Sequence, residues 1–185
     1  MDMTVKGSFR SRKQLVLDDI VASGASTRSV KRQLRDLSHV ADDVLRQLWQ
    51  QAHFSSSLSL LAVGGYGRGE LFPHSDIDVL ILLPEGMNAE ADEAFKNSAS
   101  NFITSCWDAG LEIGSSVRTL SEALSDAHID VTIQTSLLES RLLAGAAKLH
   151  SQFAKAYRQA LNPQAFFTAK TLEAQQRHTK FEDTP

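Results

Sequence analysis

Two helical patterns open the chain. In Ser11–Val21, apolar positions recur at roughly helical spacing among charged residues. In Val30–Leu48 they recur in steps of three and four residues. We therefore predict two amphipathic helices before residue 55.

Two short apolar runs in the middle of the chain predict buried strands. Leu58–Gly65 and Ile77–Leu83 are bounded by turn residues and are too short to pack as independent helices. The residues between them are rich in Gly, Pro and Ser. We therefore expect the two strands to be neighbours in a hairpin.

The second half of the chain is mostly helical by its pattern. Ala91, Phe95, Phe102 and Cys106 mark a long helix that ends near Gly110. A weak alternation then predicts a third strand. It covers Leu111–Arg118. Helices are predicted for the remainder, at Ser121–Ala127, Val131–Leu143, Ala146–Leu161 and from Pro163 to about Phe181.

This order of elements predicts an α+β domain with a small sheet, N-terminal helices and a helical C-terminal extension. We divide the chain into N-terminal helices (residues 1–55), a catalytic core (56–120) and the helical extension (121–185). A length of 185 residues with 42% hydrophobic residues suits one globular domain.

Composition narrows the function classes. The chain has 19 Lys+Arg against 22 Asp+Glu and no basic stretch, which argues against a nucleic-acid partner. Cys106 is its one cysteine, so an intramolecular disulfide and a CxxC metal site are excluded. The apolar runs are much shorter than the roughly 20 residues that cross a membrane. We therefore expect a cytoplasmic protein without a membrane partner.

The segment Leu61–Leu83 holds the residues that indicate chemistry. Asp76 and Asp78 open the second predicted strand, where alternate side chains share a face. Such a pair supplies hard oxygen ligands for Mg²⁺, which completes its shell with phosphate and water oxygens. Gly64 and Gly65 end the preceding strand, where the absence of a Cβ lets backbone N–H groups approach a phosphate. Together these features are typical of phosphoryl or nucleotidyl transfer.

Each of these features alone has a simpler explanation. Glycines at a strand end more often form only a turn, and paired aspartates are more often solvated. Their conjunction favours a site. Two other phosphate-binding motifs do not fit. A Rossmann motif is G-x-G-x-x-G, but after Gly65 and Gly67 the next glycine, Gly69, comes one residue too early. A Walker A loop has Lys and then Ser or Thr after its second glycine, but Glu70 and Leu71 follow Gly69.

The spacing of these residues resembles the nucleotidyltransferase superfamily that includes DNA polymerase β and the aminoglycoside nucleotidyltransferases. Its signature is a glycine pair, then a short spacer, then the pattern Dh[DE]h, in which h is an apolar residue. Ten residues separate Gly65 from Asp76 here. The blocks AVGGYGRGEL, SDID, LEIGSSVRTL and SLLESRLLAG are similar to the N-terminal catalytic domain of the bifunctional uridylyltransferase/uridylyl-removing enzymes. The resemblance continues weakly into Lys170–His178. It implies a small mixed sheet of the polymerase β-like type.

The resemblance implies three acidic residues that hold two Mg²⁺ ions. Asp76 and Asp78 are the first two. Glu112 and Asp130 are alternatives for the third, and Asp130 is also explained as the N-cap of a helix. We favour Glu112 because it lies in a predicted strand, although the superfamily usually has Asp there.

Four residues are predicted to bind the nucleotide. Gly64 and Gly65 would position the phosphates, Arg68 would contact the triphosphate and Ser75 would bond a phosphate oxygen. The alternatives are that Arg68 is only a surface residue of the loop and that Ser75 only caps its turn.

Other polar residues in or near the resembling blocks receive weaker predictions. Arg118 and Arg141 are expected to form ion pairs that hold the fold. Lys170, Arg177 and His178 could approach the nucleotide, with exposure on the surface as the alternative.

The implied reaction is transfer of UMP from UTP to a tyrosine hydroxyl of the PII nitrogen-signalling protein, with release of pyrophosphate. Full-length members of the family also carry a metal-dependent HD hydrolase domain and ACT domains. We find no H…HD…D set in this chain and expect it to be the transferase module alone. The alternatives are a nucleotidyltransferase of the type found with CBS or cyclic-nucleotide modules, and a non-catalytic protein-binding domain. The sequence does not identify the base.

Overall fold

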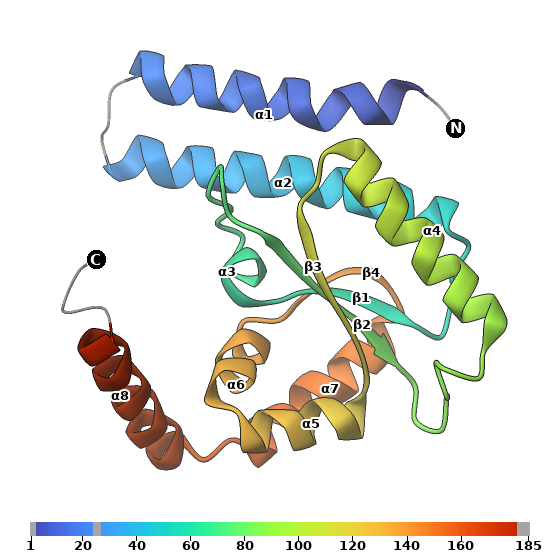
Figure 1. The fold of residues 1–185 in the computed structure, drawn as a ribbon, viewed down its shortest axis with the longest axis vertical. Coiled ribbons are helices and arrows are strands. Elements are labelled where there is room, and N and C mark those ends of the chain that lie inside the picture. Colours follow the sequence, from blue (N-terminus) through green and yellow to red (C-terminus); the bar gives the residue numbers. More distant parts are fainter. Residues whose placement is uncertain (1–2, 24–26, 181–185) are drawn as a thin grey trace.

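A computed structural model describes residues 3–23 and 27–180 (Figure 1). The first three helices are α1 (Met3–Ser23), α2 (Thr27–Gln51) and the single turn α3 (Gly64–Gly67). Five further helices follow, namely α4 (Glu93–Ala109), α5 (Leu120–Ile129), α6 (Val131–Leu138), α7 (Ala147–Ala160) and α8 (Pro163–Lys180). The strands are β1 (Ser59–Ala62), β2 (Ile77–Leu83), β3 (Ile113–Thr119) and β4 (Arg141–Gly145).

The described strands form one mixed sheet in the order β3-β2-β1-β4. β1 and β2 pair antiparallel, as the predicted hairpin requires. β3 lies parallel to β2 and β4 antiparallel to β1. The small mixed sheet with many helices confirms the predicted α+β fold, and it is consistent with the polymerase β-like type.

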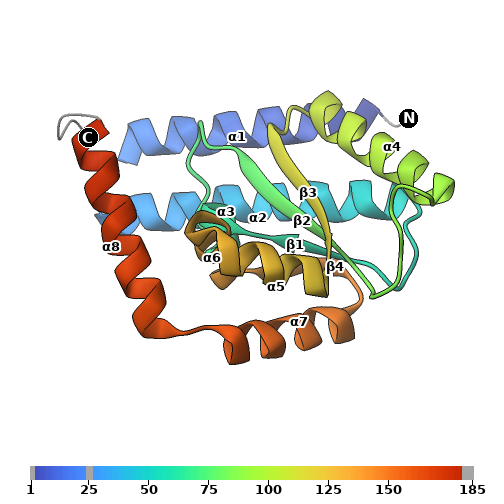
Figure 2. The same cartoon turned by 60° about the horizontal axis from the view of Figure 1, so that its bottom comes forward.

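Helices cover both faces of the sheet (Figures 1 and 2). Leu60, Val79 and Ile81 point to the face covered by α1, α2 and α4. Leu61 and Leu80 point to the face covered by α5, α6 and α7. The two central strands are therefore buried on both sides, which explains why their sequences read as continuous apolar runs.

The helix α4 has the limits that the sequence predicts. The Asp92 side chain accepts a hydrogen bond from the backbone N–H of Phe95 at 2.9 Å, which caps the first turn. Gly110 ends the helix in the left-handed conformation, with φ of 86°. The cap fixes where the chain turns into β3.

The predicted helix Val131–Leu143 is wrong in its last part. The helix α6 ends at Leu138, and Arg141–Gly145 is the strand β4. This segment pairs with the free edge of β1, and backbone pairing between distant segments outweighs a local helical periodicity there. The helical region after residue 120 therefore also contributes an edge strand to the sheet.

The helix α8 confirms the last predicted helix, although Phe181 lies outside the described residues. It follows Pro163, and it contacts α6. In the described part of the chain, no helix is both long and apolar enough to cross a membrane.

Gly145→Ala is expected to destabilise the fold by clearly more than Gly86→Ala. Both glycines have positive φ, of 89° and 81°, so alanine costs about 1–2 kcal/mol at either position. A Cβ on Gly145 would also lie 2.1 Å from the Leu58 carbonyl oxygen, whereas a Cβ on Gly86 meets no atom within 4 Å. Urea unfolding followed by circular dichroism measures both free energies. Equal losses would contradict the close packing of Gly145 against the Leu58 carbonyl.

Candidate functional site

Asp76 immediately precedes β2, and Asp78 is the second residue of that strand. Within the strand, Ile77 is buried and Asp78 is exposed, so the aspartate points away from the α2 side. Burial of its carboxylate raises the pKa of Asp78, and the negative charge of Asp76 raises it further. The structure therefore brings the two predicted acids into electrostatic contact.

Two glycines flank the Asp78 carboxylate. A Cβ on Gly64 would lie 3.3 Å from Asp78 Oδ2, and Gly64 has φ of +60°. Gly114 is the partner of Asp78 in the parallel β2–β3 register, and a Cβ there would lie 2.6 Å from Asp78 Oδ1. Both carboxylate oxygens thus face backbone without a side chain between them.

A cleft of about 350 Å³ opens beside Asp78. One wall is β3, with Ser115 and Ser116, and the other is α6, with Thr132 and Ser136. A Cβ on Gly64 would lie 3.5 Å from Ser136 Oγ, so the glycine turn borders this helix. The cleft combines a carboxylate with several hydroxyl groups, a lining that suits a phosphate-bearing ligand with its cation.

The predicted glycine loop is a strand end followed by one helical turn. Val63 is extended, and the chain turns at Gly64 into α3. A Cβ on Gly65 would come no closer than 3.6 Å to Arg68 Nη2, so this part of the backbone is open. Gly67 is different, because a Cβ there would lie 2.1 Å from the Glu139 carbonyl oxygen.

The other two predicted nucleotide ligands have different surroundings. Arg68 is half-exposed and forms an ion pair with Glu139, with 2.5 Å between Nη1 and Oε2. Ser75 is exposed, and its backbone N–H donates to the Phe72 carbonyl oxygen at 3.1 Å. Neither side chain lines the cleft beside Asp78.

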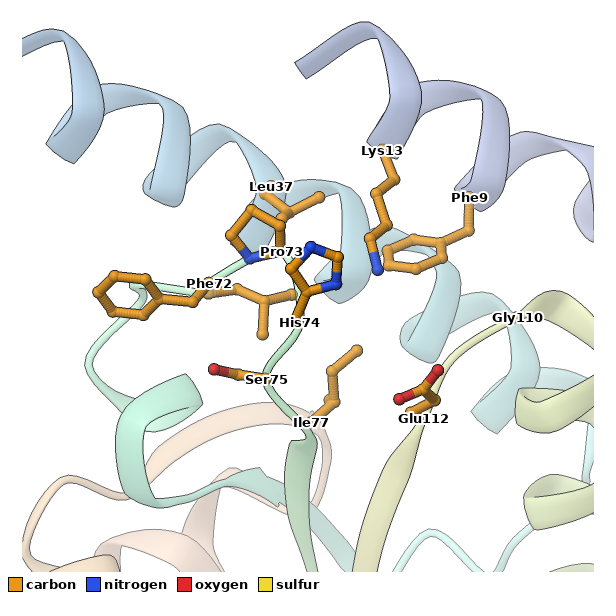
Figure 3. A pocket seen from close by; sticks show the side chains of 11 residues that line it. Phe9, Lys13, Leu37, Phe72, Pro73, His74, Ser75, Ile77, Gly110 and Glu112 are labelled. Atoms are coloured by element: carbon orange, nitrogen blue, oxygen red, sulfur yellow. The ribbon is translucent and has the colours of Figure 1, made fainter. Parts of the chain in front are cut away.

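Glu112 lines a separate, smaller pocket, of about 70 Å³ (Figure 3). It shares that pocket with Lys13 of α1 and with His74 and Ser75 of the loop before β2. Its backbone carbonyl accepts from the Ile77 N–H at 2.8 Å. In residues 3–23 and 27–180, no three His, Cys, Asp or Glu side chains are grouped to hold a metal, so the structure does not bring Glu112 together with both aspartates.

Asp130, the alternative third acid, is the N-cap of α6. Its Oδ1 accepts from the Thr132 hydroxyl at 2.6 Å and from the Thr132 backbone N–H at 2.7 Å. These hydrogen bonds lower the pKa of Asp130. The capping explanation of this residue is therefore confirmed.

The predicted ion pairs of two arginines are present. Arg118 Nε lies 2.7 Å from Asp126 Oδ2 at the border of the cleft. Arg141 of β4 donates to both carboxylate oxygens of the buried Asp42, at 2.6 and 3.0 Å.

The three basic residues near the C-terminal end lie on α8. Lys170 and Arg177 both pair with Glu173 of the same helix. His178 is exposed. None of the three lines the cleft beside Asp78.

Comparison with known proteins agrees with this arrangement. Residues 43–136, about half of the chain, match the family described as "Nucleotidyltransferase domain". The chain belongs to this family. Its range contains β1, β2, β3 and every residue that lines the cleft beside Asp78 except Leu137.

Relatives of the chain carry a more specific name. It is 47% identical over 180 residues to the "Bifunctional uridylyltransferase/uridylyl-removing enzyme" of Burkholderia mallei (strain SAVP1) and of Burkholderia pseudomallei (strain K96243). Each alignment covers 97% of this chain and 20% of the relative. The resemblance read from the sequence blocks is therefore confirmed, and the chain spans about a fifth of the length of these relatives.

Several residues of the cleft could not be predicted from the sequence. Gly114, Thr132 and Ser136 line it, yet none belongs to a recognisable metal or phosphate motif. One signal was available for Gly114. It stands two residues after Glu112 in a predicted strand, so it shares a face with that acid.

Asp78→Asn is expected to raise the free energy of unfolding of the metal-free chain at about pH 7. The pKa of Asp78 is higher in the folded chain than its ordinary value, so its ionisation disfavours the native state. The stability gain of the variant should be absent below the ordinary pKa of about 3.9, grow as the pH rises to the folded pKa, and stay constant above it. Urea unfolding in EDTA, from about pH 3 to about pH 8, measures this profile.

The matched control for this prediction is Asp36→Asn. Asp36 is exposed on α2, on the opposite side of the sheet, so its substitution removes one carboxylate outside the cleft. If the wild-type chain is as stable as the Asp78→Asn variant at every pH, the unfavourable ionisation of Asp78 beside Asp76 is contradicted.

Proposed function

We propose that this chain transfers UMP from UTP to a tyrosine hydroxyl of a PII nitrogen-signalling protein and releases pyrophosphate. The observation that carries the proposal is the Asp76–Asp78 pair beside a cleft bordered by glycines, in a chain of the nucleotidyltransferase family. The uridylyl group is supported by the name of the relatives. The PII acceptor rests on the resemblance of the four sequence blocks.

The residues at the cleft fit a divalent cation. Asp76 and Asp78 offer carboxylate oxygens, and Gly64 and Gly114 leave the space next to Asp78 free of side chains. Bound Mg²⁺, expected as two ions, would neutralise charge on the triphosphate and lower the pKa of the tyrosine hydroxyl. The two carboxylates repel each other, and this repulsion favours binding of a cation beside them.

The glycine turn would position the phosphates. Gly64 and Gly65 expose backbone near Asp78, which lets an anion approach closely. Arg68 lies next to Gly65, and in this role its guanidinium would exchange Glu139 for a phosphate oxygen. Ser75 and Glu112 would act from the adjacent smaller pocket, Glu112 as the third acid that the resemblance implies.

The wider setting of the proposal follows from the relatives. Their name includes a uridylyl-removing activity, and by resemblance we assign it to an HD domain outside this chain. ACT domains of the full-length enzyme and a cytoplasmic location belong to the same proposal. The net charge of −3 is compatible with a protein acceptor instead of a nucleic acid.

Asp76→Asn and Asp78→Asn are each expected to lower the rate of PII uridylylation by about three orders of magnitude. Each change removes an anionic ligand that holds the charge-stabilising cation, and loss of such electrostatic stabilisation has effects of this size. The measurement is incorporation of radioactive UMP from labelled UTP into PII by the full-length enzyme with Mg²⁺.

The Asp36→Asn variant is again the matched control, because it removes one carboxylate on α2, outside the cleft. It should retain the wild-type rate. Wild-type labelling in both Asp76→Asn and Asp78→Asn would overturn the catalytic proposal and would favour a protein-binding domain.

Binding should also distinguish the nucleotides. The relatives are named as uridylyltransferases, so the chain is expected to bind UTP at least about tenfold more tightly than ATP in the presence of Mg²⁺. Isothermal titration calorimetry of both nucleotides into the chain measures the ratio. Tighter binding of ATP would instead favour a nucleotidyltransferase of the type found with CBS modules.

A further inference from the structure

We propose that the acceptor protein docks by adding an extended, tyrosine-containing segment to the free edge of β3, which brings the tyrosine hydroxyl to the Asp78 carboxylate. The inference rests on the proposed function and concerns how the acceptor is held. β3 is an end strand of the sheet and pairs on one side only, with β2 (Figure 2).

The outer edge of β3 offers unpaired backbone groups. The Glu112 carbonyl oxygen accepts from the Ile77 N–H at 2.8 Å, so it points toward β2. The backbone groups of successive residues in a strand point to alternate sides, which directs those of Ser115 and Val117 away from β2. Both residues are exposed, and the part of the chain that the structure describes provides no partner for their N–H groups.

This edge lacks the usual protection of an edge strand. Proteins commonly use charged side chains, proline or a bulge to prevent such a strand from pairing with another chain. β3 pairs with β2 in an unbroken register over seven residues, and its only charged side chain, Arg118, is bound to Asp126. The opposite edge strand, β4, has five residues, and its pairing with β1 contains a register shift. An extended segment therefore fits the edge of β3 better than that of β4.

The free edge runs beside the candidate site. Gly114 is the partner of Asp78 in the β2–β3 register, and Asp78 Oδ1 lies 2.6 Å from the position that a Gly114 Cβ would take. The carboxylate of Asp78 therefore lies over the edge strand itself. Ser116, the next residue on this face of β3, is also small, so neither side chain blocks the way from the edge to the cleft.

This geometry suits a tyrosine as the presented side chain. An added strand would lie about 4.8 Å from β3, and residues directly opposite each other point to the same face. A tyrosine opposite Gly114 would thus extend along the face that carries Asp78. Main-chain hydrogen bonds would hold the segment, and its position opposite Gly114 would select the tyrosine, as is typical of strand addition. The nucleotide would keep the cleft between β3 and α6.

Amide hydrogen exchange tests the pairing directly. The wild-type full-length enzyme is exchanged with and without saturating PII, in the presence of Mg²⁺ and a UTP analogue with an α,β-methylene bridge. Single amides of β3 are read by mass spectrometry with electron-transfer fragmentation. With PII, the N–H groups of Ser115 and Val117 should exchange at least about tenfold more slowly, whereas those of Gly114 and Ser116, which face β2, should be unchanged. A partner that only covers this surface would not produce the alternation.

A substitution on the edge tests the same pairing by kinetics. Val117→Pro removes one outward N–H and leaves the bonds to β2 in place, because edge strands tolerate proline at such positions. It should raise the KM for PII by about tenfold, the effect of one lost hydrogen bond, and leave the KM for UTP within about twofold. Val117→Thr restores the N–H on a β-branched residue and should recover the wild-type KM for PII.

The outcomes that overturn the inference are distinguishable. A wild-type KM for PII in Val117→Pro, or no added protection at Ser115 and Val117, would overturn it and leave the proposed function intact. Protection that appears without PII and grows with enzyme concentration would assign the edge to a second copy of the chain. Failure of the wild-type enzyme to label PII would overturn the proposed function as well. If Val117→Pro loses UTP binding, the exchange pattern of the wild type decides alone.

Discussion

The buried carboxylate of Asp42 connects the parts of the molecule that make the site. Its Oδ1 accepts from the Tyr66 hydroxyl at 2.6 Å, and both oxygens accept from Arg141. Burial and the charge of Asp42 raise the pKa of Tyr66, so this hydroxyl stays protonated as a donor. Removing the Asp42 carboxylate would leave the buried Tyr66 hydroxyl without its acceptor, a loss that costs about 1–3 kcal/mol. Three segments far apart in sequence, α2, α3 and β4, are thereby held in one arrangement.

This arrangement decides where the glycine turn lies. Arg141 also donates to the Gly67 carbonyl oxygen at 3.4 Å, and Gly67 has no room for a side chain beside Glu139. The turn is therefore fixed at its C-terminal end by packing and at its N-terminal end by β1. Gly64 is then held against the Asp78 carboxylate, in a backbone conformation that favours glycine. The geometry of the cleft thus depends on a hydrogen-bond network that lies outside it.

Local signals in the sequence were enough for much of this structure. The apolar runs of β1 and β2, the capped helix α4 and the pair Asp76 and Asp78 depend on neighbours in the chain, and the structure has each of them. The strand β4 depends on pairing with β1, more than 70 residues earlier, which no local periodicity records. The facing of Gly114 and Asp78 depends on the register between two strands. The Arg68–Glu139 pair depends on the place of α6, so this partner of Arg68 could not be predicted from the sequence.

Without a bound cation, Asp76 and Asp78 lower the stability of the folded chain, and this is informative about their use. The two carboxylates repel each other, and that of Asp78 is also partly desolvated. Substitution of one aspartate by asparagine would remove this unfavourable energy. A protein selected only for a folded scaffold has no physical reason to keep them together beside two glycines. A site that binds a cation and an anionic nucleotide does, because the repulsion is removed when the positive charge arrives.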